Sequence, residues 1–250
     1  MKSNFSNTST SFQTVTSNGS AENVFNAAGS GDLEAVMYLI NAKKVDVNSK
    51  LTDGGTPLNG HLNVAKFLVE KGANVNQIDK WGYSALLWAV DSHIAGLNLI
   101  KYLVEHKADV NVRDKQKGYT TSHWVAEHGD LEMVKYLVEK GARFDEKANK
   151  GETPLHLAAA NNRLNVLQYF IDERGAKLTI FDAAEKGLTN AVKYFIERKN
   201  KVVNAVDQNG WTVLHRAAYS GNLETVKYLV AGKKANVDAS NAHNTAPITP

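Results

Sequence analysis

The chain of 250 residues contains no cysteine. This absence excludes disulfide bonds, catalysis by a thiolate and metal binding through cysteine sulfur. A lack of cysteine also fits a protein that works in a reducing compartment, so we expect the chain to act in the cytoplasm.

An excess of one charge and long hydrophobic runs are also missing. The 29 basic and 26 acidic side chains leave a formal net charge of +3, which is too balanced for a nucleic-acid or membrane footprint. No uninterrupted run of about 18 apolar residues occurs, and the N-terminus lacks the apolar stretch of a secretory signal peptide. We therefore expect no nucleic-acid partner and no membrane partner.

Residues 1–20 have almost no apolar content, and thirteen of them are Ser, Thr or Asn. Such a segment gains too little from burial to offset the entropy lost on ordering, so we predict a disordered leader. Polar, unstructured N-termini also occur in bacterial proteins that injection machines secrete. A secreted bacterial effector and a plain solvated leader both fit this segment.

The chain does contain one sequence motif, which recurs along nearly its whole length. Clear copies are residues 129–137 (GDLEMVKYL) and 221–229 (GNLETVKYL). Its aromatic position falls, at steps of 29, 35, 34, 33, 25 and 34 residues, at Tyr38, Phe67, Tyr102, Tyr136, Tyr169, Tyr194 and Tyr228. We interpret these steps as seven units of about 33 residues, numbered one to seven, of which units two and six are shortened.

Unit five shows how the motif builds a pair of helices. Thr153 is a good helix N-cap, and Pro154 suits the first helical position, where its missing N–H costs nothing. A second helix is predicted from Leu164, and Gly175 then offers the left-handed conformation that ends a helix. Gly72 and Gly141 repeat this stop in other units.

The segments between the helix pairs carry turn signals. Residues 79–82 and 207–210 place Asp first and Gly fourth, which suits a type I turn. We call these projecting segments fingers. A helix pair of this size buries its apolar face only against its neighbours, so the pairs must stack into one elongated core.

The sequence 151–159 (GETPLHLAA) resembles the signature of the ankyrin repeat, with weaker copies starting at Gly82, Gly118 and Gly210. The resemblance covers roughly residues 21 to 248. It implies an all-α ankyrin-repeat solenoid of helix-turn-helix pairs with projecting fingers. We divide the chain into the leader 1–20, the solenoid 21–240 and a stub 241–250 that resembles an incomplete eighth finger.

Two units depart from the pattern. Unit two passes from Pro57 almost directly to His61, so most of its first helix is missing and the stack should be loosest there. In unit six, residues 176–184 lead straight into the first helix, so a finger is missing and the binding surface should bend or divide. Decay of the sequence without any function would also explain unit two.

Three of the eight histidines share one position of the repeat, namely His123, His156 and His215. The resemblance implies that this histidine forms hydrogen bonds between neighbouring fingers. His123 and His128 have the wrong spacing for a zinc site on one helix, and no phosphate-binding glycine loop occurs. We predict no metal, no cofactor and no enzyme activity.

Relatives of this kind bind other proteins through finger tips and first helices, which line a concave groove. Trp and Tyr are enriched at such contacts because they bury much area with few rotors to freeze. Units three and four therefore supply the predicted principal patch, although Trp88 and Trp124 could instead fill space between helices. The candidate partner-binding residues are Lys80, Trp81, Tyr83, Trp88, Lys117, Tyr119, Trp124, Lys150, Glu152, Trp211, Arg216 and Tyr219.

We interpret the chain as a monomeric, cytoplasmic adaptor or scaffold that binds another protein without catalysis. An alternative is the recruiting part of a larger protein, such as a ligase, a toxin or a bacterial effector that acts in a host cytosol. A degenerate array without a specific partner is the third hypothesis.

Overall fold

The structure is a computed structural model, and it describes residues 19–58, 61–92, 96–242 and 245–247. The predicted disordered leader lies outside these residues except for its last two positions. Within the described ranges the regular structure is helical, and none of these helices is long and apolar enough to span a membrane.

The helices follow one another in short antiparallel pairs. Their bounds are α1 (Gly19–Ser30), α2 (Leu33–Asn41), α3 (Leu62–Glu70), α4 (Ala85–Asp91), α5 (Leu97–Glu105), α6 (Thr121–His128), α7 (Leu131–Glu139), α8 (Pro154–Ala160), α9 (Leu164–Gln168), α10 (Ile180–Glu185), α11 (Thr189–Glu197), α12 (Val213–Tyr219) and α13 (Leu223–Lys227). Two π-helical turns, η1 (Tyr169–Glu173) and η2 (Tyr228–Gly232), continue α9 and α13.

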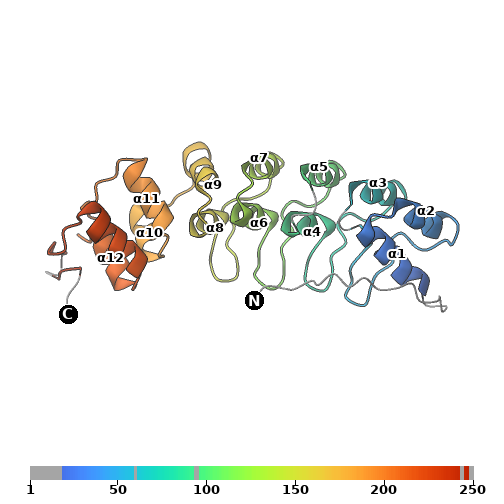
Figure 1. The fold of residues 1–250 in the computed structure, drawn as a ribbon, viewed down its shortest axis with the longest axis horizontal. Helices are drawn as coiled ribbons and strands as arrows, with labels where there is room; N and C mark the ends of the chain where they lie inside the picture. Colours follow the sequence, from blue (N-terminus) through green and yellow to red (C-terminus); the bar gives the residue numbers. More distant parts are fainter. Residues whose placement is uncertain (1–18, 59–60, 93–95, 243–244, 248–250) are drawn as a thin grey trace.

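The pairs stack side by side into the predicted all-α solenoid. The first helices α4, α6 and α8 form an inner row, and α3, α5, α7 and α9 form an outer row, which lies above it in Figure 1. Small side chains such as Ala126 and Ala158 are fully buried in the core of the array, and so are leucines such as Leu137. Each fully buried leucine contributes about 1.5–3 kcal/mol relative to an exposed one.

The helix starts and stops lie where the sequence predicts them. α8 begins at Pro154, and its N-cap Thr153 forms a capping box with His156. Gly72, Gly141 and Gly175 have φ of +90°, +93° and +68°, the left-handed region that favours glycine. These local signals set the length of each helix.

Consecutive fingers are joined by backbone hydrogen bonds. Lys80 N donates to Asp53 O at 2.6 Å, Lys115 N to Trp81 O at 2.8 Å, and Asn149 N to Lys117 O at 2.8 Å. This finger ladder runs through units two, three, four and five, and it fixes the spacing of the finger tips.

A second set of hydrogen bonds runs along the loops that follow the outer helices. Asn76 Nδ2 donates to Lys107 O at 2.9 Å, and its Oδ1 accepts from Asp109 N at 2.7 Å. Asn48 and Asn111 make the same pair of bonds to the next unit. We call this series the asparagine ladder.

Unit two has the predicted deletion. The described part of the chain between α2 and α3 forms turns, and the inner row has no helix between α1 and α4. Its finger is nevertheless formed, because Gly54 N donates to Leu51 O at 2.8 Å and Gly55 N to Asp53 Oδ1 at 3.0 Å.

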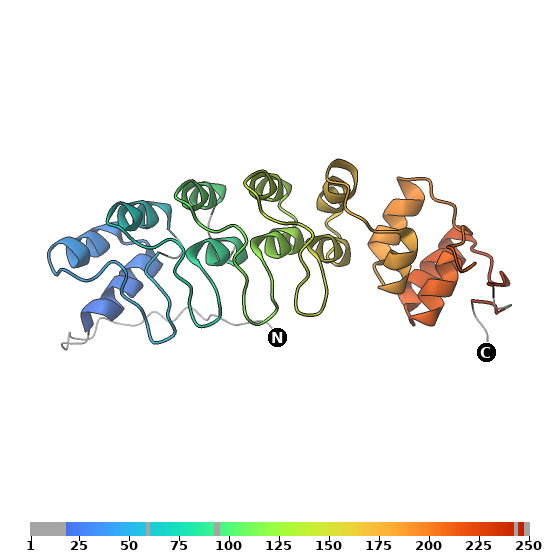
Figure 2. The same ribbon diagram turned by 180° about the vertical axis from the view of Figure 1, so that it is seen from behind.

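Unit six retains both helices and lacks the finger. The N-cap Thr179 of α10 forms a capping box with Asp182, which takes the place of the histidine used in other units. α11 packs on both α8 and α9. In Figures 1 and 2, α4 to α9 are seen nearly end-on whereas α10 to α12 lie across the view, so the array bends where a finger is missing.

Candidate protein-binding surface

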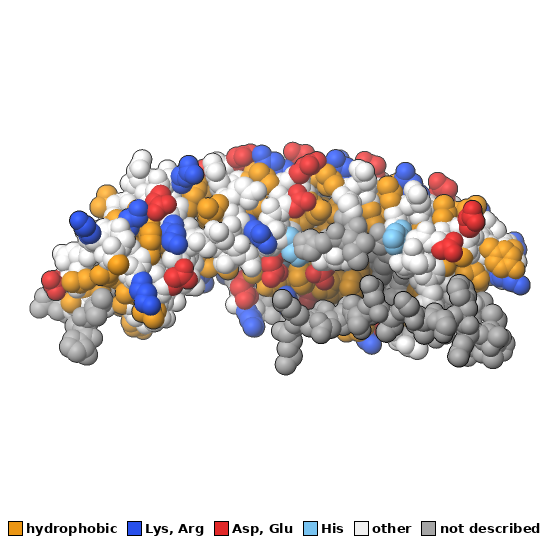
Figure 3. All heavy atoms as spheres, in the orientation of Figure 1, with side chains coloured by type: hydrophobic (Ala, Val, Ile, Leu, Met, Phe, Trp, Pro, Cys, Tyr) orange, Lys and Arg blue, Asp and Glu red, His pale blue; other side chains and the backbone are white. Residues whose placement is uncertain are grey.

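The fingers and the inner row together line the hollowed side of an arch. Figure 3 shows hydrophobic and acidic side chains beneath the middle of this arch, while the upper, outer-helix side carries a mixture of both charges. The candidate residues of units three, four and seven belong to the fingers and inner helices on the hollowed side.

A buried aspartate organises the finger of unit three. Asp79 Oδ1 accepts hydrogen bonds from the backbone N–H groups of Trp81 and Tyr83, each at 2.9 Å. Its Oδ2 accepts from Trp88 Nε1 of α4, also at 2.9 Å. One carboxylate therefore fixes the finger against the inner helix, and all three aromatic side chains are half-buried.

Two of these aromatic rings contact each other, and the third contacts a lysine. The centroids of Tyr83 and Trp88 lie 4.7 Å apart, and Lys80 Nζ lies 4.3 Å from the Trp81 ring. Burial, together with the carboxylates of Asp91 and Asp114, raises the pKa of Tyr83 far above its ordinary value. Its phenol therefore stays protonated at neutral pH.

Unit four repeats this arrangement around Asp114, whose carboxylate accepts from the backbone of Gln116, Lys117 and Tyr119 at 2.7–2.9 Å. The rings of Tyr119 and Trp124 lie 5.3 Å apart, and Trp124 reaches Tyr83 of unit three at 6.4 Å. Lys117 Nζ lies 4.4 Å from the Trp124 ring.

Tyr119 and Trp124 are each only 8% exposed, and for Trp124 this burial favours the alternative that it fills space between helices. Lys117 Nζ lies 4.8 Å from the Tyr119 ring and 4.4 Å from the Trp124 ring, so little of either ring is open to a partner, and contact at these two positions stays a prediction. Burial and nearby carboxylates, Glu127 first, raise the pKa of Tyr119 to about 12. These two rings support the surface that Trp81, Tyr83 and Trp88 present.

Three buried polar atoms of α6 make no hydrogen bond within the described part of the chain. They are Ser122 Oγ, Trp124 Nε1 and Glu127 Oε2. Buried polar groups are usually paired, so their concentration on one inner helix is unusual.

A second aromatic cluster lies in unit seven. Asp207 accepts from Arg216 Nε at 2.9 Å, and the Arg216 guanidinium lies 5.0 Å from the Trp211 ring. Burial alone would raise the pKa of Asp207, but the hydrogen bonds from Arg216 and from the finger backbone hold it below its ordinary value. Trp211 also contacts Tyr219 at 5.3 Å, and Tyr219 is 77% exposed.

The histidine role implied by the family resemblance is confirmed at two positions. Thr120 N donates to Nδ1 of His123, so Nε2 carries the proton and donates to Glu152 O of the next finger at 3.2 Å. His215 Nε2 likewise lies 3.0 Å from Thr245 O in the C-terminal stub. Burial lowers the pKa of His123, which favours the neutral ring that this geometry needs.

The remaining candidates belong to unit five. Lys150 is exposed at the finger tip and Glu152 is half-buried beside it. They lie between the aromatic surface of units three and four and the cluster of unit seven, so the structure brings the candidates together as two groups rather than one.

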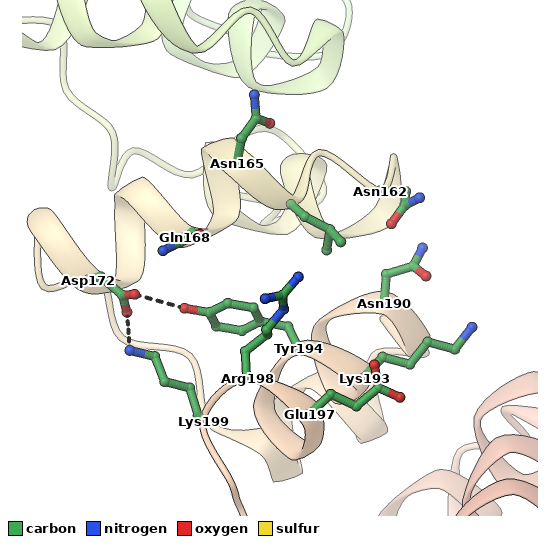
Figure 4. A pocket seen from close by; sticks show the side chains of 11 residues that line it. Asn162, Asn165, Gln168, Asp172, Asn190, Lys193, Tyr194, Glu197, Arg198 and Lys199 are labelled. Atoms are coloured by element: carbon green, nitrogen blue, oxygen red, sulfur yellow. Dashed lines mark hydrogen bonds and ion pairs between the residues drawn. The ribbon is translucent and has the colours of Figure 1, made fainter.

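The sequence reasoning did not anticipate a cleft of about 690 Å³ between α9–η1 and α11, on the outer side of the array (Figure 4). Asp172 accepts from Tyr194 Oη at 3.0 Å and pairs with Lys199 Nζ at 2.7 Å along its edge. The shortened unit six was the available signal. Among the described residues, no cluster of three or more His, Asp or Glu side chains could hold a metal ion.

Comparison with known proteins accounts for the repeated helix pairs. The family model described as ankyrin repeats (3 copies) matches residues 24–114, 95–182 and 179–241. Transient receptor potential cation channel subfamily A member 1 of Homo sapiens is 25% identical over 213 residues, which cover 79% of this chain and 19% of that protein.

Two further relatives give a similar result. Rabankyrin-5 of Mus musculus is 28% identical over 55% of this chain and 12% of its own length. Putative palmitoyltransferase ZDHHC13 of Danio rerio is 30% identical over 74% of this chain and 30% of its own length. The chain thus spans less than a third of each of these relatives. The family matches extend over most of the stacked helix pairs, and we conclude that the chain belongs to the ankyrin-repeat family.

Proposed function

We propose that this chain binds a partner protein through its hollowed side, with Trp81, Tyr83 and Trp88 at the centre of the contact. Ankyrin repeats indicate a protein–protein interaction module. The repeats supply the rigid inner row, and the variable side chains on the fingers supply the specificity.

The observation that carries this proposal is that the half-buried aromatic side chains of unit three are held in place by hydrogen bonds and by the rings of unit four. Asp79 holds the finger and α4 together, and the buried rings of unit four back them. When a partner covers these side chains, they lose little rotamer entropy, because their positions are already fixed in the free chain. This preorganisation is typical of residues that dominate binding energy.

Binding without catalysis is the expected activity. The family is generally non-catalytic, and one relative is named as a putative palmitoyltransferase, which describes that protein alone. We also propose that the chain acts as a monomer in the cytoplasm, as an adaptor or scaffold.

A second candidate is that the chain recruits a partner to a larger protein. The three relatives favour this possibility, because each carries the matching segment within a chain more than three times as long. Both candidates use the same binding surface, so one experiment tests the surface for either.

The test is capture of partners from cell lysate by the wild-type chain and by Trp81→Ala, followed by calorimetry with each purified protein that is captured. Trp81→Ala should weaken the true partner by more than about 1 kcal/mol. Tyr38→Ala on the outer helix α2, at an aromatic residue that is 55% exposed and is not a candidate contact, is the matched control and should retain the partner. Circular dichroism must match for all three proteins, and equal affinity of Trp81→Ala and wild type would contradict the proposal.

A further inference from the structure

The missing inner helix of unit two leaves a hollow in the inner row. It lies between α1, the finger of unit two and unit three, and its volume is about 290 Å³. It suits one long side chain.

The chemistry of the walls selects the kind of side chain. Flat aromatic groups come from Phe25, Trp81 and Trp88, and carboxylates come from Asp53 and Asp79. Among the described residues that line it, none is Lys or Arg. Aromatic faces and carboxylates together favour a cation with a flat or aliphatic body.

The chain shows the same combination within unit seven. There the Arg216 guanidinium lies between the Asp207 carboxylate and the Trp211 ring. Asp207 occupies the finger position of Asp79, and Arg216 occupies the inner-helix position of Trp88. In unit three a tryptophan stands at that position, and Lys80 Nζ lies 4.3 Å from the Trp81 ring. Because no Lys or Arg is among the described residues that line the hollow, a cation inside it must come from outside.

We propose that the hollow of unit two binds an arginine side chain of the partner protein. This inference rests on the proposed function, since it assigns one contact of the same partner. The guanidinium would stack on Trp81 or Trp88 and face Asp53, whose Oδ1 accepts from Gly55 N at 3.0 Å. A partner segment that continues from this anchor reaches the aromatic surface of unit three directly, because Trp81 and Trp88 belong to both.

The test uses a probe that requires no knowledge of the partner. N-acetylarginine N-methylamide is titrated into the full chain, and the indole N–H signals of its four tryptophans are followed by ¹H–¹⁵N NMR. Each signal is assigned with a Trp→Phe variant. The expected result is a saturable shift of the Trp81 and Trp88 signals, with Trp124 and Trp211 unchanged. The leucine analogue should shift none of them, and the lysine analogue should bind more weakly because it lacks the planar stacking group.

Gly29 of α1 allows the hollow to be blocked without a clash. It lines the hollow, and a Cβ atom built on it meets no heavy atom within 4 Å. Gly29→Leu should abolish the shifts, while the matched control Gly29→Ala should retain them. Asp53→Asn should weaken the arginine probe by about two- to fivefold, the range of a partly exposed charge pair. Glu132→Gln on the outer helix α7 is its control.

Three results would overturn the inference. They are no shift with arginine, equal shifts of all four indoles, and shifts that persist in Gly29→Leu. None of these bears on the capture experiment with Trp81→Ala, which reads binding of a whole protein. A chain that binds the probe but captures no partner would refute the proposed function and leave the arginine site standing.

Discussion

Units two and six have lost opposite parts of the same repeat. Unit two keeps a finger, with Lys80 N bonded to Asp53 O, but has no inner helix in its described residues. Unit six keeps α10 and α11 but has no finger. The first loss opens a hollow of about 290 Å³ on the binding side, and the second opens a cleft of about 690 Å³ on the outer side.

The comparison separates the tasks of the two parts. Inner helices fill the hollowed side, because the inner row opens into a hollow where the helix of unit two is missing. Fingers hold neighbouring units in register, because the array bends where the finger ladder stops. The loss of an inner helix can therefore change the binding surface, and the loss of a finger can change the curvature of the array, without one requiring the other.

The largest expected effect concerns the core beside unit two. Leu137 of α7 and Leu68 of α3 are both fully buried at the same position of the repeat. Leu137→Ala should reduce the free energy of unfolding by about 2–5 kcal/mol, and Leu68→Ala should fall at the lower end of this range, because a site without an inner helix relaxes more easily. Urea unfolding followed by circular dichroism measures both. Leu164→Ala, at an exposed leucine, is the control, and equal losses would contradict the comparison.

The next prediction compares the stability contributed by one hydrogen bond at the hollow of unit two with that of one hydrogen bond at the outer cleft. Trp88→Phe removes a hydrogen bond to the buried Asp79 carboxylate and should cost about 1.5–3 kcal/mol. Tyr194→Phe removes a bond to the more exposed Asp172 at the outer cleft and should cost less than about 1 kcal/mol. Thermal unfolding of the two variants decides the order. A larger loss at Tyr194 would show that the outer cleft is the more rigid site.

A third prediction tests the missing finger of unit six. His123 caps α6 and also reaches the next finger, whereas His156 faces a unit that has none. His123→Ala should therefore cost about 1–2 kcal/mol, and His156→Ala should cost less, since only its capping bond is lost. Chemical denaturation measures the difference. Similar losses would mean that the bond between fingers contributes little.

The smallest effect is a dependence on pH. Burial lowers the pKa of His123 in the folded chain below the ordinary value of 6.5. Below about pH 6.5 the unfolded chain binds a proton that the folded chain does not, so stability should fall as the pH drops toward 5. One such group contributes at most about 1.4 kcal/mol per pH unit. Urea midpoints at several pH values should give a flatter profile for His123→Gln, and an unchanged profile would assign the fall to other groups.

The sequence correctly predicted the features that depend only on residues within one repeat unit, namely where helices begin and end. The start of α8 follows from Thr153 and Pro154, and its capping box lies within four residues. The stops at Gly72 and Gly141 are equally local, because only the backbone conformation of one residue is involved. Signals of this kind need no knowledge of the neighbouring unit.

The features that arise between units were beyond such reasoning. Trp88 and Trp124 share one position of the repeat, yet Trp124 is enclosed between complete units while Trp88 borders the hollow. The bonds of Asn76 to Lys107 and Asp109 exist only once units three and four are stacked. Burial and pairing at these positions depend on the neighbour, which the local pattern does not contain.

The asparagine and finger ladders also have a mechanical consequence. From Asn48 to Arg143 they run along the array as two rows of short bonds, one between the loops that follow the outer helices and one between the fingers. A pulling force along the arch is shared between both rows over units two to five. Between units five and six the load passes to helix packing and to the pairs that Asp172 forms with Tyr194 and Lys199, so we expect the array to flex most at α10.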